Sequence, residues 1–232
     1  MHVSGRSDMR SRQRRLPALI SGALLALAAS GVLTAQASAA AILVPEACVV
    51  NSGDRGSTMD VDGSGFTAGD SIDLTTNSGA GFGTATVGAD GTFATTMTAP
   101  LLSKIGPAES AFVLTAQDET DDVTTATTTF AAANLAVSTK PAEAKPGKKV
   151  TYNFSGFTSG ADIYAHYLHR RKVTATTKFG RAQGPCGTLK TRAKLYPGRE
   201  RFETYKVQFD DSRHYSTKSR PRIPTTLSVF HF

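Results

Sequence analysis

The chain contains no tryptophan and only two cysteines in 232 residues, and no stretch shows the apolar spacing of a long helix. Two cysteines are too few for the disulfide scaffold of a small secreted domain, and the missing helical spacing argues against a helical bundle. Threonine, valine, glycine and serine are abundant instead. This composition favours strands joined by turns, so an all-β protein is expected.

The usual catalytic motifs are missing as well. The sequence has no G-x-S-x-G nucleophile turn, no H-E-x-x-H zinc motif and no convincing order of Ser, His and Asp. The run from Asp60 to Gly65 resembles the start of a calcium loop, but Ser71 stands where that loop needs a bidentate glutamate. His166 and His169 are three residues apart, so in a strand they point to opposite faces and cannot share a metal ion. We therefore expect no enzyme activity, no cofactor and no metal site.

Basic residues are scarce in the first half of the chain, and acidic residues are few in the second half. Residues 46–133 hold 2 Lys and Arg against 12 Asp and Glu, a net charge of −10. Residues 134–232 hold 19 against 6, a net charge of +13, and residues 1–45 hold 5 against 1. This split predicts two units that differ in their partners, and the basic unit is expected to attract polyanions.

Residues 1–39 have the order of a secretory signal peptide. Arginines precede an apolar run from Leu16 to Leu33, and small residues at 35–39 offer cleavage after Ala37 or Ala39. No cysteine that could carry a lipid follows directly, and no apolar tail ends the chain. We expect an exported protein, secreted or associated with the cell envelope, with no membrane span after cleavage.

Two short runs organise the remaining chain: SGFTAG at 64–69 and SGFTSG at 155–160, which lie 91 residues apart. Each lies between two runs of alternating apolar and polar residues, the pattern of half-buried strands. The glycine after each serine is expected to supply the positive φ of a tight turn, and the phenylalanine to fold into the core. The residues given these structural roles are Gly65, Phe66, Gly156 and Phe157.

A repeat of about 90 residues is too long for a solenoid unit and fits a whole small domain. We predict an all-β protein with two tandem immunoglobulin-like β-sandwich domains after the signal peptide, residues 40–133 being acidic and residues 134–232 basic. The first is expected to have strands at about 41–50, 57–64, 71–76, 83–88, 92–98, 111–117 and 124–130. The second is expected to have strands at about 135–139, 148–155, 162–169, 172–178, 187–195, 202–209 and 225–230. A short linker is expected near 131–134.

The two cysteines, Cys48 and Cys186, fall in different halves and at positions that the repeat does not match. A disulfide inside either sandwich core is therefore excluded. In an exported protein the pair can bridge the two domains or join two molecules, and the sequence leaves both arrangements open.

The positive charge of the second half gathers in two places. Every second residue from 190 to 194 is a cation, which puts three cations in one outward row of a strand, and a second cluster follows an earlier strand. These candidate binding residues are Lys190, Arg192 and Lys194 in the row and Arg170, Arg171 and Lys172 in the cluster. One interpretation is a solvated sheet face. The other is a face that binds a polyanion, because a net charge of +13 exceeds what solubility needs.

The strand–GF-turn–strand motif behind a signal of this kind resembles secreted bacterial immunoglobulin-like domains. The second half, with FSGFTSGADIYAHYLHRRK, FGRAQGPCGTL and VQFDDSRHYS, resembles a recurring domain of exported actinobacterial proteins. The first half is similar, more loosely, to the GF-turn sandwiches that include the neocarzinostatin-type chromophore carriers, whose two internal disulfides this chain lacks. The resemblance implies the fold and the exported location, and it implies no catalytic residue.

These features predict an exported, non-enzymatic binding module of the cell envelope or the extracellular space. Its basic domain would engage an anionic cell-wall polymer or extracellular nucleic acid. Two alternatives stay open. One is a structural or adhesion protein whose oppositely charged domains pack together or join molecules end to end, and the other is a carrier of a small ligand.

Overall fold

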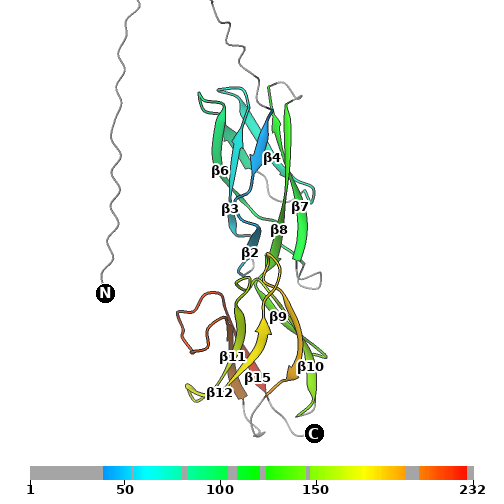
Figure 1. The fold of residues 1–232 in the computed structure, drawn as a ribbon, viewed down its shortest axis with the longest axis vertical. Coiled ribbons are helices and arrows are strands. Elements are labelled where there is room, and N and C mark those ends of the chain that lie inside the picture. Colours follow the sequence, from blue (N-terminus) through cyan, green and yellow to red (C-terminus); the bar gives the residue numbers. More distant parts are fainter. Residues whose placement is uncertain are drawn as a thin grey trace, which may run out of the picture. The chain divides into compact units, whose positions relative to one another are not determined.

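A computed structural model describes residues 39–53, 55–79, 83–103, 109–120, 124–144, 147–196 and 204–228. The predicted signal peptide lies outside these ranges except for its last residue. The described residues form fifteen strands in four sheets and no helix (Figure 1). Accordingly, these ranges hold no helix long and apolar enough to cross a membrane.

The first eight strands make two sheets, which we call the first sandwich. Their order in the sheets is β1-β3-β6 and β2-β8-β7-β4-β5. The strands are β1 (Ala41–Leu43), β2 (Cys48–Asn51), β3 (Thr58–Ser64), β4 (Ser71–Thr76), β5 (Gly83–Thr86), β6 (Thr92–Thr98), β7 (Glu109–Asp118) and β8 (Thr125–Asn134). One cluster of buried apolar residues draws side chains from both sheets, so the sheets pack face to face.

The remaining strands make the second sandwich, with sheets β13-β10-β9 and β12-β11-β14-β15. They are β9 (Ala136–Lys140), β10 (Lys149–Ser155), β11 (Asp162–His169), β12 (Lys172–Arg181), β13 (Leu189–Lys194), β14 (Thr204–Asp210) and β15 (Arg222–Ser228). Taken in chain order, each sandwich has one sheet of the A, B and E strands and a facing sheet of the C, F and G strands, which is the immunoglobulin topology. The predicted fold class is confirmed.

The hydrogen bonds that close the two GF turns repeat one for one. In each copy the amide of the phenylalanine donates to a glycine carbonyl in a later turn, and the amide of the last glycine donates to a carbonyl after the next hairpin. The matched bonds are Phe66 N to Gly91 O and Phe157 N to Gly187 O, both 3.3 Å, and Gly69 N to Val87 O and Gly160 N to Ala182 O, both 3.0 Å. The two sandwiches therefore share one local plan.

Within these turns Gly65 and Gly156 have φ angles of 79° and 77°, in the left-handed region that favours glycine. Phe66 and Phe157 are buried and belong to the core of their own sandwich. The turn thus fixes the backbone and anchors it in the core at the same place.

Two details differ from the predicted strands. The strand expected at 41–50 is divided near Pro45, so that β1 pairs antiparallel with β3 and β2 pairs parallel with β8 in the opposite sheet. A change of sheet depends on partners far along the chain, which local alternation cannot reveal. The linker expected at 131–134 is wrong, because these residues extend β8, where Ala132 and Ala133 are fully buried. Leu135 alone lies between β8 and β9.

Candidate functional site

Lys190, Arg192 and Lys194 lie on β13, an edge strand of the sheet β13-β10-β9. All three are exposed, and the residues between them are half-buried, because successive side chains in a strand point to opposite faces. Leu189 and Ala193 pack against the core of the second sandwich. The alternation therefore turns the three cations outward together.

Pairing between strands adds two cations that sequence spacing did not group with this row. Lys149 of β10 is the direct cross-strand partner of Lys194, and Thr151 stands between Arg192 on one side and Lys140 of β9 on the other. Alternate residues of a strand are about 7 Å apart, and neighbouring strands lie about 4.8 Å apart. The cations are thus spread over all three strands of one sheet. We call this set the basic face: Lys140, Lys149, Lys190, Arg192 and Lys194.

The basic face carries no carboxylate on its three strands. The two ion pairs found among the described residues, His166–Asp210 and Lys178–Asp162, both involve strands of the other sheet. Directly opposed like charges such as Lys149 and Lys194 weaken strand pairing. The face therefore holds positive charge that folding does not require.

Arg170 and Arg171 form the two-residue turn between β11 and β12, with φ angles of 46° and 68°. A hairpin turn with two positive φ angles favours Asn-Gly or Gly-Gly, and a side chain in the left-handed region costs about 1–2 kcal/mol per residue. Two arginines are therefore kept where local conformational preference disfavours them. Lys172 follows as the first residue of β12 and is exposed.

Strand direction places this turn at the same end of the second sandwich as Lys149 and Lys194. The turn 156–161 joins the end of β10 to the start of β11, so the end of β11 lies with the start of β10. Ring contacts connect the same end: His169 lies 5.8 Å from Tyr205, and Tyr205 stacks on Tyr196 at 4.4 Å, centroid to centroid. The arginine turn and the Lys194 end of the row thus lie at the same end of the sandwich but belong to different sheets.

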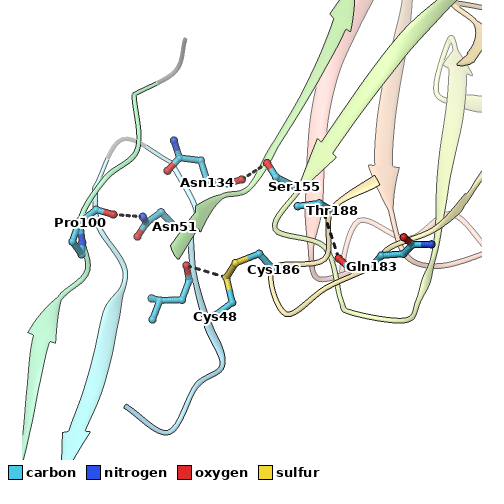
Figure 2. The surroundings of a disulfide bond; sticks show 9 residues. Cys48, Asn51, Pro100, Asn134, Ser155, Gln183, Cys186 and Thr188 are labelled. Atoms are coloured by element: carbon cyan, nitrogen blue, oxygen red, sulfur yellow. Dashed lines mark hydrogen bonds between the residues drawn. A yellow bond between two sulfur atoms is a disulfide. The ribbon is translucent and has the colours of Figure 1, made fainter. Parts of the chain in front are cut away.

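A disulfide between Cys48 and Cys186 settles the cysteine question within one chain (Figure 2). It joins the first residue of β2 to the turn between β12 and β13, with a Cα–Cα distance of 5.2 Å and a sequence separation of 138 residues. Of the two arrangements that the sequence left open, the bridge therefore takes the one that links the first and second sandwiches within one molecule.

Backbone contacts lie beside the bridge. Leu135 N donates to Asn51 O at 2.7 Å. The Ser155 hydroxyl donates to Asn134 O, also at 2.7 Å (Figure 2). A Cβ on Gly156 would come within 2.7 Å of Val50 Cγ1, so the second GF turn approaches β2 closely. These contacts are all between uncharged groups. The junction contacts of the described residues therefore do not depend on attraction between the acidic and basic halves.

A buried polar cluster on the outer side of the sheet β12-β11-β14-β15 was missed by the sequence analysis. His166 and Asp210 are fully buried, and His166 Nε2 lies 3.2 Å from Asp210 Oδ1 and 3.0 Å from Ser212 O. Gln208 donates to Asp210 and to Ser216 O. These contacts hold residues 211–221, the loop between β14 and β15, which we call the 211–221 loop. Partners more than 40 residues apart in the sequence leave no local signal.

His166 and His169 lie on opposite sides of β11, His166 beneath the 211–221 loop and His169 against Tyr205. In the described part of the chain no group of three His, Cys, Asp or Glu side chains is arranged to hold a metal ion. Asp60 and Asp62 lie exposed along β3, in the middle of a regular strand pairing with β6 rather than in a loop.

No protein-family model matches the chain, and no curated protein matches it. Solved structures similar to it include a tetra-tandem repeat from the extending region of a large adhesion protein, with 13% identity over 82% of this chain and 49% of that chain and a TM-score of 0.28. Bovine butyrophilin shows 7% identity, 84% and 100% coverage and a TM-score of 0.33. A tandem pair of titin immunoglobulin domains shows 11% identity over 81% of this chain and 95% of that chain, with a TM-score of 0.26. This chain spans about half the length of the adhesion-protein structure. Similarity at this level does not indicate function.

Proposed function

We propose that the protein is an exported, non-enzymatic binding module whose basic face engages a linear anionic polymer outside the cell. The observation that carries the proposal is a three-strand sheet face with five cations and no carboxylate. A polyanion laid on such a face releases its counterions, which favours binding without recognition of sequence.

Lysines on edge strands also prevent sheets from pairing edge to edge, so protection against aggregation is the competing explanation. Both β13 and β9 are edge strands, and their cations fit that role. Lys149 does not, because β10 is the central strand and Lys149 stands opposite Lys194. Arg170 and Arg171, kept in an unfavourable turn, point the same way. Binding explains all of these positions, whereas edge protection explains part of them.

The face offers charge and hydrogen bonds but no aromatic surface. None of the described residues that line its three strands on the outer side is aromatic, since Tyr152 and Phe154 of β10 point into the core. Proteins that bind single-stranded nucleic acid stack its bases on aromatic rings. A polymer bound through the charge along its backbone, such as a phosphate-bearing wall glycan, therefore suits the face better than a single-stranded nucleic acid bound through its bases.

The experiment measures binding of the mature chain to a polyphosphate or a wall-derived phosphate polymer over a range of salt concentrations. Affinity is expected to fall steeply with salt, and the variant Lys190→Gln/Arg192→Gln/Lys194→Gln should flatten the slope of log K against log salt by about 2–3. The matched control, Ala94→Glu/Thr96→Glu/Thr98→Glu, changes the net charge equally on the corresponding strand of the first sandwich. Equal losses in both variants would mean that only net charge matters, and a wild-type chain that binds nothing at low salt would refute the proposal.

Export is part of the same proposal. The order of basic, apolar and small residues in positions 1–39 supports cleavage after Ala37 or Ala39. Mass spectrometry of the protein recovered from culture medium or from the envelope fraction is expected to find one of these new N-termini. Recovery of the chain with Met1 intact would contradict it.

A structural or adhesive role is the second candidate, and the junction between the sandwiches favours it. Two covalent connections join the halves: the single residue Leu135 between β8 and β9, and the Cys48–Cys186 disulfide. Immunoglobulin-like domains joined by long linkers move independently, whereas two covalent connections limit such motion. Under this hypothesis the triple variant of β13 would leave attachment to the envelope unchanged, and loss of the disulfide would weaken it.

A further inference from the structure

A hollow with a volume of about 630 Å³ opens on the outer side of the sheet β12-β11-β14-β15, the sheet opposite the basic face. Its lining comes from two sources. Tyr164, Thr176 and Lys178 belong to strands β11 and β12, and Arg213 and His214 belong to the 211–221 loop. The volume lies in the range of sites that hold small molecules.

The loop that forms one wall is fixed by buried partners. Asp210 accepts hydrogen bonds from His166, from Gln208 and from the amide of Ser212, and all three of the side chains Asp210, His166 and Gln208 are buried. Within the loop the Ser212 hydroxyl donates to His214 O and accepts from His214 N. At the loop's far end the Arg222 guanidinium donates to Thr217 O at 2.7 Å. Arg213 and His214 are therefore held on a preorganised support, which lowers the entropy lost when a ligand binds.

The donor set in the hollow specifies the ligand chemistry. Arg213 supplies a guanidinium, the group best suited to carboxylate and phosphate, and no carboxylate lies within ion-pair distance of it among the described residues. Lys178 supplies a second cation, although Asp162 lies 2.6 Å from its Nζ and offsets part of its charge. The hollow therefore attracts a small oxyanion rather than a cation or an apolar molecule.

Thr176 adds a position for a hydroxyl group of the ligand. His166 Nε2 donates to Asp210 and Ser212 O, and His166 Nδ1 shares one hydrogen bond with the Thr176 hydroxyl at 3.1 Å. That bond uses either the hydrogen or one lone pair of the Thr176 hydroxyl, so further hydrogen-bonding capacity remains at the edge of the hollow. A ligand hydroxyl, which both donates and accepts, satisfies it.

We propose that this hollow is a binding site for a small hydroxylated oxyanion, either a uronic acid or a sugar phosphate. The oxyanion lies against Arg213 and Lys178, and a sugar hydroxyl forms a hydrogen bond with Thr176. The Tyr164 ring forms the wall beside the sugar. The site does not depend on the basic face, because the two lie on opposite sheets of the second sandwich.

Amide NMR spectra of the mature chain, recorded at low salt, test the proposal with five probes: glucuronate, glucose 6-phosphate, glucose, acetate and inorganic phosphate. Glucuronate or glucose 6-phosphate is expected to shift the amides of 211–216 and 176–178 to saturation below about 10 mM. Glucose, acetate and inorganic phosphate should each bind at least about tenfold more weakly. The preferred anion identifies the source as carboxylate or phosphate.

Arg213→Gln is expected to weaken binding of the preferred probe by about tenfold or more, the loss typical of one charge-assisted hydrogen bond. Lys218→Gln is the matched control, since it removes the same charge from the same loop outside the hollow. Lys190→Gln/Arg192→Gln/Lys194→Gln should leave this binding unchanged. The proposal is overturned if neither sugar anion saturates, if inorganic phosphate binds as tightly as glucose 6-phosphate, or if Arg213→Gln and Lys218→Gln behave alike.

Discussion

The same sheet face carries opposite charge in the two sandwiches. Aligned on the GF turn and on Gly91 and Gly187, the strand pairs β3–β6 and β10–β13 match residue for residue, because Gly63 faces Phe93 as Phe154 faces Leu189. At the positions of Lys190, Arg192 and Lys194 the first sandwich has Ala94, Thr96 and Thr98, and at the positions of Thr151 and Asn153 it has Asp60 and Asp62. The turns and the inward residues preserve the fold, so the outward residues were free to diverge.

The cores differ as well. The fully buried residues of the first sandwich are mainly aliphatic, such as Val61, Ile72 and Leu74. The second sandwich is built around aromatic rings, and Tyr152 lies 4.6 Å from Phe179 and 6.2 Å from Phe209, measured between centroids. All six tyrosines of the chain belong to the second half. Tyrosine fluorescence therefore reports on the second sandwich alone, which allows the two halves to be compared in one chain.

The matched glycines Gly91 and Gly187 should give the largest difference between the halves. A Cβ on Gly187 would lie 1.6 Å from Phe157 O, whereas one on Gly91 would lie 3.0 Å from Phe66 O. We expect Gly187→Ala to lower the free energy of unfolding of the second sandwich by about 3–5 kcal/mol, and Gly91→Ala to cost the first about 1–2 kcal/mol. Denaturant unfolding followed by tyrosine fluorescence and by circular dichroism measures both. Equal effects would contradict this, because they would show that the two turns constrain the backbone equally.

Removing the bridge should show how far the two halves unfold together. We expect Cys48→Ala/Cys186→Ala to lower the free energy of unfolding by about 2–4 kcal/mol, since the cross-link restricts the unfolded chain. Without it, tyrosine fluorescence and circular dichroism should report different midpoints, because each sandwich has its own core. A single shared transition in the variant would mean that the junction contacts couple the halves without the bridge.

Alkaline solution should destabilise the second sandwich and spare the first. Burial raises the pKa of Tyr152 from 10.0 to about 12, and burial together with Tyr152 raises the pKa of Tyr167 further. The unfolded phenol ionises near pH 10 while the folded one stays neutral, so stability is complete below pH 10 and falls as the pH rises toward 12. Thermal melts between pH 8 and about 11 measure this loss, and Tyr152→Phe should reduce it. If the first sandwich lost as much stability, the cause would be the change in the net charge of the protein rather than the buried tyrosines.

The smallest effect is expected at the arginine turn, and it has the opposite sign. Arg170→Asn/Arg171→Gly should stabilise the second sandwich by about 1–2 kcal/mol, because Asn-Gly suits two positive φ angles. The same variant should weaken binding of an anionic polymer by removing two cations. Thermal melts and the salt-dependent binding assay measure the two effects on one sample. A gain in stability without a loss of affinity would remove these arginines from the binding surface.

The strand positions and the outward row on β13 were predictable because both depend on local alternation. Lys140 and Lys149 could not be grouped with that row, since their place depends on how β9 and β10 pair with β13. The cluster of His166 and Asp210 depends on contact between residues 44 apart, and the bridge on residues 138 apart. Period-two patterns state which face a side chain occupies, but they do not state its neighbour.

The covalent link between Cys48 and Cys186 also decides how the chain would respond to a pull on its ends. Tension entering at either terminus crosses the sulfur bridge, so residues 49–185 carry no load, and this segment contains every strand from β3 to β12. At about 3.3–3.6 Å per extended residue, the bridge withholds roughly 450–500 Å of contour length across its 138 residues. Only the segments outside the bridge, which include β1 and the strands β13 to β15, can extend while the bridge is intact. Reduction of this one disulfide would make the whole of that contour length available for extension.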